Sequence, residues 1–475
     1  MTRPEYPRFM IRRSALALAL AALTVGVTAC TGGDPAPERF APGAEGVGDS
    51  YFPTYGNGGY DVAGYALKLR YDPSDDRLEG TATITAKATQ NLSRFNLDYR
   101  GPAISAVTVD GAAATQKVES DELVVTPPAG LPEGATFTTV VTYAGVPQPI
   151  TSPELGTGGW LATPKGAIAL GQPESASSWF PVNDHPSDKA TYALEMTVPS
   201  ALAVLSNGVQ GEKSDAGAGW TTWRWTESSP MASYLTTVVI GDFRVSETTH
   251  RGRPLVTGVD ASLPAGGAAD RAMARTGEIA DFLETQFGTY PFDAYGGIVV
   301  ADDRIGYALE TQSRPVYGDT FFRTGTNEWV VAHELAHQWF GDSVSLAAWK
   351  DIWLNEGFAT YAEWLWSEHD GGLPVQTAFD REYAVTSWTD PSYDPGRFAI
   401  FGNAVYKRGG LTVHALRMEV GDDAFFEILK TWTSERRDGI ATTDDFIALA
   451  ERVSGKPLRE FLMTWLTSKT APPRP

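Results

Sequence analysis

Residues 327–340 read NEWVVAHELAHQWF, and the interpretation of the whole chain starts from this stretch. It contains good helix formers and no interior glycine or proline, so we expect it to be helical. Residues four positions apart lie on the same face of a helix. His333 and His337 can therefore present two imidazoles to one ion, with Glu334 beside them. Two neutral imidazoles suit zinc, so the pattern predicts a metal site on this helix.

A second stretch, WLNEGFATYAE at residues 353–363, supplies a carboxylate on another predicted helix. A catalytic zinc needs a third protein ligand and an open position for water. We therefore predict one zinc ion per chain, bound by the two histidines and Glu356. Zinc lowers the pKa of its water to about 7, and an adjacent carboxylate such as Glu334 can accept the proton and pass it to a leaving amine.

Together, HELAHQWFGD and WLNEGFATYAE resemble the gluzincin aminopeptidases, the family of alanyl aminopeptidase and leukotriene hydrolase. The resemblance covers roughly residues 51–466. It implies that His333, His337 and Glu356 bind zinc and that Glu334 is the general base. Glu363 either orients a ligand histidine or is an exposed helix glutamate.

Residues 305–312, IGYALETQ, resemble the family's Gly-Ala-Met-Glu-Asn signature, in which the glutamate binds the free α-amino group of the substrate. Glu310 falls on that glutamate. Tyr307 replaces the glycine, Leu309 the methionine and Thr311 the asparagine. The match therefore implies amine binding but does not fix the preferred substrate side chain.

A further family resemblance lies at residues 171–175, GQPES, followed by WFPVNDHP at 179–186. It implies that Gln172 and Glu174 contact the first substrate residue. Two carboxylates beside a dication would offset the desolvation of a buried ammonium and place the cleavage one residue from the amino terminus.

The stretch FGNAVYKRG at residues 401–409 resembles the family's Tyr-x-Lys-Gly segment. Hydrolysis of a peptide bond develops an oxyanion, which a donor beyond the zinc stabilises. Tyr406 is the candidate for that donor. Together these residues predict an enzyme that hydrolyses the first bond of peptides with a free N-terminus.

Three alternatives remain open. A related zinc endopeptidase or an epoxide hydrolase would use the same metal residues, since leukotriene hydrolase shares the site. A non-catalytic lipoprotein could bind peptides through a relic of it. Retention of the general base and of Tyr406 argues against the last of these.

The periodicity of the chain predicts an α+β multidomain protein. Residues 51–247 show short alternating segments rich in Thr and Val, which predict a β-rich N-terminal domain. Examples of these segments are residues 65–71, 80–86, 137–143 and 234–240. The family resemblance implies that this domain contains a saddle-like antiparallel sheet.

Residues 248–475 are predicted to form a thermolysin-like, mainly helical zinc peptidase domain. Ile279 to Phe287 follow one helical face, and Gly288 is placed to end that helix. Thr442 with Asp445 predicts the start of another helix.

The first 29 residues resemble a secretory signal, with arginines before the apolar run Ala15 to Leu23. Cys30, the only cysteine, resembles a lipoprotein box and is the predicted lipidation site. Residues 30–50 are rich in Gly and Pro and predict a flexible tether. We expect an exported, outward-facing lipoprotein attached to the bacterial cell membrane. Arg12-Arg13 leaves the export route, general or twin-arginine, open.

Charge excludes one class of partner. The chain has 475 residues and a formal net charge of −20. A protein that neutralises phosphates needs a basic face, so we expect no nucleic-acid partner. The sequence leaves the oligomeric state and the preferred N-terminal residue open.

Overall fold

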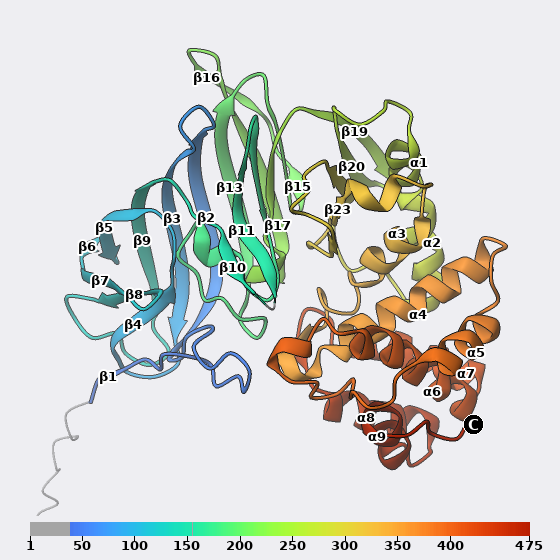
Figure 1. Cartoon of the computed structure of the whole chain (residues 1–475). Helices are drawn as coiled ribbons and strands as arrows, with labels where there is room; N and C mark the ends of the chain where they lie inside the picture. The colour runs from blue at the N-terminus through green and yellow to red at the C-terminus, as the bar shows by residue number, and fades with distance from the viewer. Residues whose placement is uncertain (1–38, 154) are drawn as a thin grey trace, which may run out of the picture. The chain divides into compact units, whose positions relative to one another are not determined.

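The computed structural model describes residues 39–153 and 155–475. The predicted signal sequence and Cys30 therefore lie outside the described residues. From Phe40 to Pro475 the chain forms one compact unit, shown in Figure 1.

The first half of this unit is built on a mixed sheet whose long strands alternate buried and partly exposed residues, as period two requires. Strands β2 (Tyr60–Asp72) and β3 (Arg77–Ala88) pair in antiparallel register from Tyr60 with Ala88 to Asp72 with Arg77, whereas β2 and β13 (Lys189–Pro199) run parallel. In spatial order the sheet contains β15 (Val209–Gln210), β17 (Trp220–Ala232), β13 (Lys189–Pro199), β2 (Tyr60–Asp72), β3 (Arg77–Ala88), β9 (Thr136–Gly145), β5 (Ala103–Val109) and β6 (Ala112–Ala113), and β16 (Ser214–Gly217) pairs with β17.

Two smaller sheets accompany it. The first has the order β10 (Ile150–Ser152), β11 (Gly156–Thr163), β12 (Gly166–Leu170), β18 (Val238–Gly241) and β14 (Ala203–Ser206). The second has the order β1 (Ala41–Pro42), β4 (Leu92–Asp98), β8 (Glu122–Thr126) and β7 (Thr115–Glu119).

The predicted strands at 65–71, 80–86 and 137–143 are confirmed, since they lie in β2, β3 and β9. The prediction for 234–240 is wrong in its first half. Residues Ser233–Leu235 form a 3₁₀ turn, and the strand begins only at Val238.

The predicted tether does not extend through residue 50. Ala41 pairs with Leu92 of β4, and Asp49 is buried. Its carboxylate accepts hydrogen bonds from the backbone N–H of Phe52 (3.0 Å) and of Trp349 (2.9 Å), a residue far away in the sequence. Residues 41–50 are therefore part of the folded unit. Their Gly-rich and Pro-rich composition does not predict this, because partners such as Leu92 and Trp349 are distant in the sequence.

The second half opens with another sheet, of order β19 (Phe243–His250), β20 (Arg253–Asp260), β21 (Tyr295–Val300), β23 (Val316–Gly318) and β22 (Ala308–Leu309). The predicted domain boundary at residue 247 falls inside β19. Because β19 pairs with β20 along its whole length, from Phe243 with Asp260 to His250 with Arg253, this sheet begins at Phe243, before the predicted boundary.

Helices follow this sheet: α1 (Ala268–Ala274), α2 (Thr276–Phe287), α3 (Glu328–Ala336), α4 (Trp353–His369), α5 (Val375–Val385), α6 (Gly409–Val420), α7 (Asp422–Glu435), α8 (Thr443–Ser454) and α9 (Arg459–Thr467). Two predicted helix ends are confirmed. Helix α2 ends at Gly288, whose φ of 90° suits a residue without a side chain. Helix α8 begins with a capping box between Thr442 and Asp445.

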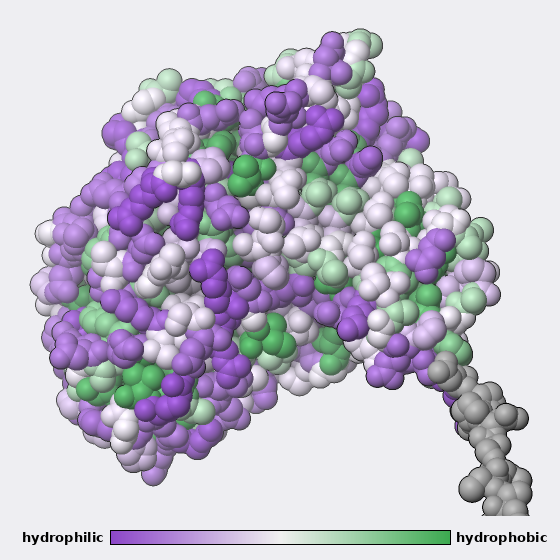
Figure 2. Space-filling model, turned by 180° about the vertical axis from the view of Figure 1, so that it is seen from behind, coloured by the Kyte–Doolittle hydropathy of each residue, from purple (hydrophilic) through white to green (hydrophobic). Residues whose placement is uncertain are grey.

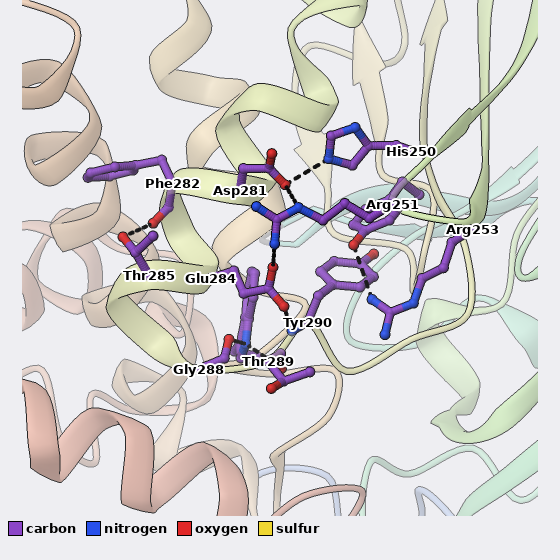
Figure 3. Close-up of polar contacts among 12 residues, drawn as sticks. His250, Arg251, Arg253, Asp281, Phe282, Glu284, Thr285, Gly288, Thr289 and Tyr290 are labelled. Atoms are coloured by element: carbon purple, nitrogen blue, oxygen red, sulfur yellow. Dashed lines mark hydrogen bonds and ion pairs between the residues drawn. The ribbon is translucent and has the colours of Figure 1, made fainter.

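The turn between β19 and β20 is fastened to α2 by charged side chains (Figure 3). The Asp281 carboxylate lies 2.7 Å from both His250 Nε2 and Arg251 Nε. Arg251 also donates to Glu284 at 2.6 Å. These partly exposed ion pairs hold the sheet on the helix that packs against α3.

Figure 2 shows mostly hydrophilic residues on one face, with hydrophobic residues in small separate patches. Among the described helices, none is both long enough and apolar enough to span a bilayer.

Candidate active site

Helix α3 places the two predicted histidines side by side. It is shorter than the predicted stretch of 327–340 and ends at Ala336. His337 still has helical dihedrals (φ −58°, ψ −24°), and its N–H bonds to the His333 carbonyl at 3.3 Å. The four-residue spacing therefore places the two imidazoles side by side, as predicted, with their centroids 4.9 Å apart.

Helix α4 packs against α3 (Figure 1) and brings Glu356 to the histidines. Glu356 Oε2 lies 3.3 Å from His333 Nε2 and 3.3 Å from His337 Nε2. Two ligand atoms bound tetrahedrally at about 2.0–2.1 Å from one zinc ion lie about 3.3–3.4 Å apart. Both distances from Glu356 Oε2 are therefore those expected of a zinc site, and the candidate ligand atoms of the three residues all lie within 4.8 Å of one another.

Burial and charge agree with this spacing. His333, His337 and Glu356 are 7%, 1% and 2% exposed. Burial raises the pKa of the Glu356 carboxyl, but the charges of the facing His337 and His333, when protonated, lower it to about 2, and Glu356 in turn raises the pKa of both histidines. The residues present therefore fit a zinc ion.

The outer nitrogen of each imidazole is also held. His333 Nδ1 lies 2.7 Å from Glu363 Oε1, and His337 Nδ1 lies 3.0 Å from the Phe340 carbonyl. Such bonds fix the ring orientation and leave Nε2 for the metal. The structure thus places Glu363 where the orienting role requires it.

Glu334 is buried and lines a cavity of about 340 Å³ together with the three candidate ligands. Burial raises the pKa of its carboxyl to about 8. A carboxyl that exchanges its proton near neutral pH is suited to general base and acid work. The structure thus places Glu334 in one cavity with the three candidate zinc ligands.

Tyr406 lines the same cavity from a short π-helical turn, Ala404–Arg408, which leads into α6. Single π turns of this kind are frequent at functional sites. The Tyr406 ring lies over the His333 ring, with centroids 6.0 Å apart and planes at 19°. Burial raises the pKa of the Tyr406 hydroxyl well above its usual value, so the hydroxyl remains a donor.

The buried Arg408 anchors this turn, and no motif in the sequence indicated its role. It donates to the carbonyls of Trp465 (2.6 Å), Asp390 (2.8 Å) and Ser468 (2.8 Å). These bonds tie the turn that carries Tyr406 to the end of α9.

Glu310 follows β22 and lines the same cavity as the candidate ligands. Its carboxylate Oε1 accepts from the Tyr234 hydroxyl (3.0 Å) and from Gln172 Nε2 (3.2 Å). Gln338 Nε2 holds the Glu310 carbonyl at 3.1 Å. Gln172 and Glu310, which were predicted separately as substrate-binding residues, are therefore in contact, although they are far apart in the sequence.

Glu174 lies in a different setting. Its Oε1 accepts from the Tyr55 hydroxyl at 2.5 Å and lies 3.3 Å from Arg100 Nη2. It lines a second cavity of about 350 Å³, to which Gln172 also contributes. Its predicted contact with a substrate amine stays a prediction. Tyr55, Arg100 and Tyr234 were not predicted from the sequence, because each lies outside any recognisable motif.

Comparison with known proteins places these residues in a family. The model of the Peptidase family M1 domain matches residues 271–465, and that of the Peptidase M1 N-terminal domain matches residues 164–235. The human glutamyl aminopeptidase is 28% identical over 322 residues, which is 62% of this chain and 33% of that protein. Aminopeptidase M1-B of Oryza sativa subsp. japonica is 28% identical over 330 residues, which is 64% of this chain and 37% of that protein. The chain thus spans about a third of the length of these curated relatives.

Solved structures match a much larger share of both chains. The M1 zinc metallopeptidase from Deinococcus radiodurans is 32% identical with a TM-score of 0.83, covering 90% of this chain and 98% of that chain. A mutant of that enzyme bound to a Tyr-Ser-Ala substrate gives a TM-score of 0.82 at 32% identity, covering 90% of this chain and 99% of that chain. With two matched M1 domain models and this likeness across both halves of the fold, the chain belongs to peptidase family M1.

Proposed function

We propose that the chain is a zinc aminopeptidase, which hydrolyses the first peptide bond of peptides that have a free amino terminus. The observation that carries this proposal is the position of Glu310. Its buried carboxylate lines the cavity of the candidate zinc ligands, and its side-chain donors, Tyr234 and Gln172, are neutral. An incoming ammonium would supply the positive charge that this carboxylate needs.

Each residue of the cavity then has a role. Zinc held by the two histidines and Glu356 would polarise the scissile carbonyl and lower the pKa of the attacking water. Glu334 takes the proton from that water and delivers it to the leaving amine. The Tyr406 hydroxyl donates to the oxyanion that develops on the carbonyl oxygen.

Recognition of the amino terminus completes the arrangement. Glu310, oriented by Gln172 and Tyr234, binds the ammonium. Glu174 is the proposed second carboxylate on that side, and it would share its charge between the ammonium and Arg100. The Deinococcus radiodurans neighbour has been solved with Tyr-Ser-Ala, a tripeptide, which supports peptides as the substrate class. Fixing the ammonium at Glu310 limits cleavage to the first bond, because the reacting carbonyl must lie at the metal.

Acetylation of the amino terminus is expected to lower kcat/KM by about 10- to 100-fold, since it leaves the buried Glu310 carboxylate without a charged partner. The measurement compares release of tyrosine from Tyr-Ser-Ala with cleavage of acetyl-Tyr-Ser-Ala by the zinc-loaded enzyme. A chelator should stop both reactions. Equal rates for the two peptides would contradict the aminopeptidase and favour a zinc endopeptidase.

We also propose that the full chain is exported and anchored outside the cell by a lipid on Cys30. Support comes from the apolar run of residues 15–23 behind arginines and from the small residues around the single cysteine. Expressed in a bacterial host, the full chain is expected to partition into a detergent phase, and Cys30→Ser into the aqueous phase. The proposal fails if both proteins partition alike.

A further inference from the structure

The two cavities described above adjoin each other. Both are lined by Gln172, Tyr307, Ala308, Phe401 and Tyr406. Gln172 is also the residue whose amide donates to Glu310. If the ammonium of a peptide sits at Glu310, the second cavity lies beside the first residue of that peptide and has room for its side chain.

The walls of this second cavity are mainly apolar. They come from the β10–β11 hairpin, from β22, from the segment before the π turn and from the segment that carries Gln172. The apolar and aromatic lining residues include Ile150, Leu155, Pro173, Tyr307, Leu309 and Phe401. Tyr307 stands where the family signature has glycine, so its ring is a wall that a glycine would not provide.

The charged groups that line this cavity are already paired. Glu174 lies against Arg100 at 3.3 Å. Arg304 binds both oxygens of Asp302, with Nε at 2.9 Å and Nη2 at 2.7 Å, and Nη2 also donates to the Ala162 carbonyl at 2.7 Å. A charged substrate side chain that entered would lose its hydration and would have to compete with these partners.

We propose that the second cavity is the pocket for the first substrate residue, and that it selects a large neutral side chain, aromatic or long aliphatic, over acidic and basic ones. This proposal rests on the proposed aminopeptidase function. A preference for neutral side chains would differ from the preference for glutamate that the name of the glutamyl aminopeptidase relatives indicates. Tyr307 is the residue that most changes the pocket relative to the family signature.

The test measures kcat/KM for release of phenylalanine, leucine, alanine, glutamate and lysine from aminoacyl reporter substrates by the zinc-loaded enzyme. Phenylalanine and leucine should exceed glutamate and lysine by about 100-fold, and alanine by about 10-fold. Fastest release of glutamate or lysine overturns the pocket assignment while the aminopeptidase stands. Release of none of the five by the zinc-loaded enzyme overturns the proposed function itself.

Two variants test whether the second cavity determines the preference for the first side chain. Leu155→Trp fills the cavity, so phenylalanine release should fall about 10-fold relative to alanine release, whereas Val146→Trp adds the same side chain at an exposed site that does not line the cavity and should leave this ratio unchanged. Asp302→Asn frees the Arg304 guanidinium from its carboxylate, so glutamate release should rise about 10-fold relative to leucine. Because Asp302→Asn only removes a charge, it remains informative if the tryptophan disturbs folding. An unchanged ratio in either folded variant overturns the assignment of this cavity.

Discussion

Replacing Glu334 with glutamine is expected to lower kcat by about 10²–10⁴-fold while zinc remains bound. The amide has nearly the same shape as the carboxyl, so the cavity that Glu334 lines with the zinc ligands is preserved. It cannot accept the proton of the attacking water or deliver one to the leaving amine. Single-turnover kinetics with a leucine reporter, together with metal analysis of the purified variant, measure both parts of the prediction.

The metal content decides between two sets of ligands. His337 lies close enough to share an ion with His333 and Glu356, and also with Glu310 and Glu334. Only the first set leaves Glu334 free to act as a base. Loss of zinc from Glu334→Gln would therefore favour the second set and contradict the proposed mechanism. Glu427→Gln, an identical change on the exposed face of α7, is the control and should keep both zinc and activity.

The metal residues could be predicted because their geometry is local. His333 and His337 are one helical turn apart, and the regular rise of a helix brings their side chains together whatever the rest of the fold does. The capping box at Thr442 and the end of α2 at Gly288 were predictable for the same reason. Glu356 could be proposed as the third ligand because it lies on a second predicted helix, whereas Glu310 needed the family resemblance; only tertiary packing brings either residue to the histidines.

The partners that shape the substrate side of the cleft could not be predicted. Tyr234 reaches Glu310 because the chain turns at Ser233–Leu235, where period-two alternation predicts a continuous strand. Arg100 and Tyr55 meet at Glu174 from separate parts of the β-rich half. Such contacts depend on strand register and loop path, on which local patterns carry no information. The packing of Asp49 against Trp349 escaped prediction for the same reason.

Tyr406→Phe is expected to reduce kcat by about 10²–10³-fold with little change in KM, because the hydroxyl donates to an oxyanion that exists only in the transition state. The phenylalanine ring can keep its place over the His333 ring, so the metal ligands stay oriented. Zinc content should therefore equal that of the unmodified enzyme. Steady-state kinetics on the leucine reporter, with metal analysis, test the prediction.

Tyr307→Phe is the matched control, since it removes a hydroxyl from the same cavity while leaving the apolar wall in place. It should leave kcat nearly unchanged. Equal losses of kcat in both variants would mean that the loss in Tyr406→Phe comes from a change in the hydration of the cavity and not from the absence of a donor to the oxyanion. A loss confined to Tyr406→Phe, seen in kcat and not in KM, assigns the hydroxyl to the transition state, because a merely structural role would also weaken the binding of substrate or zinc.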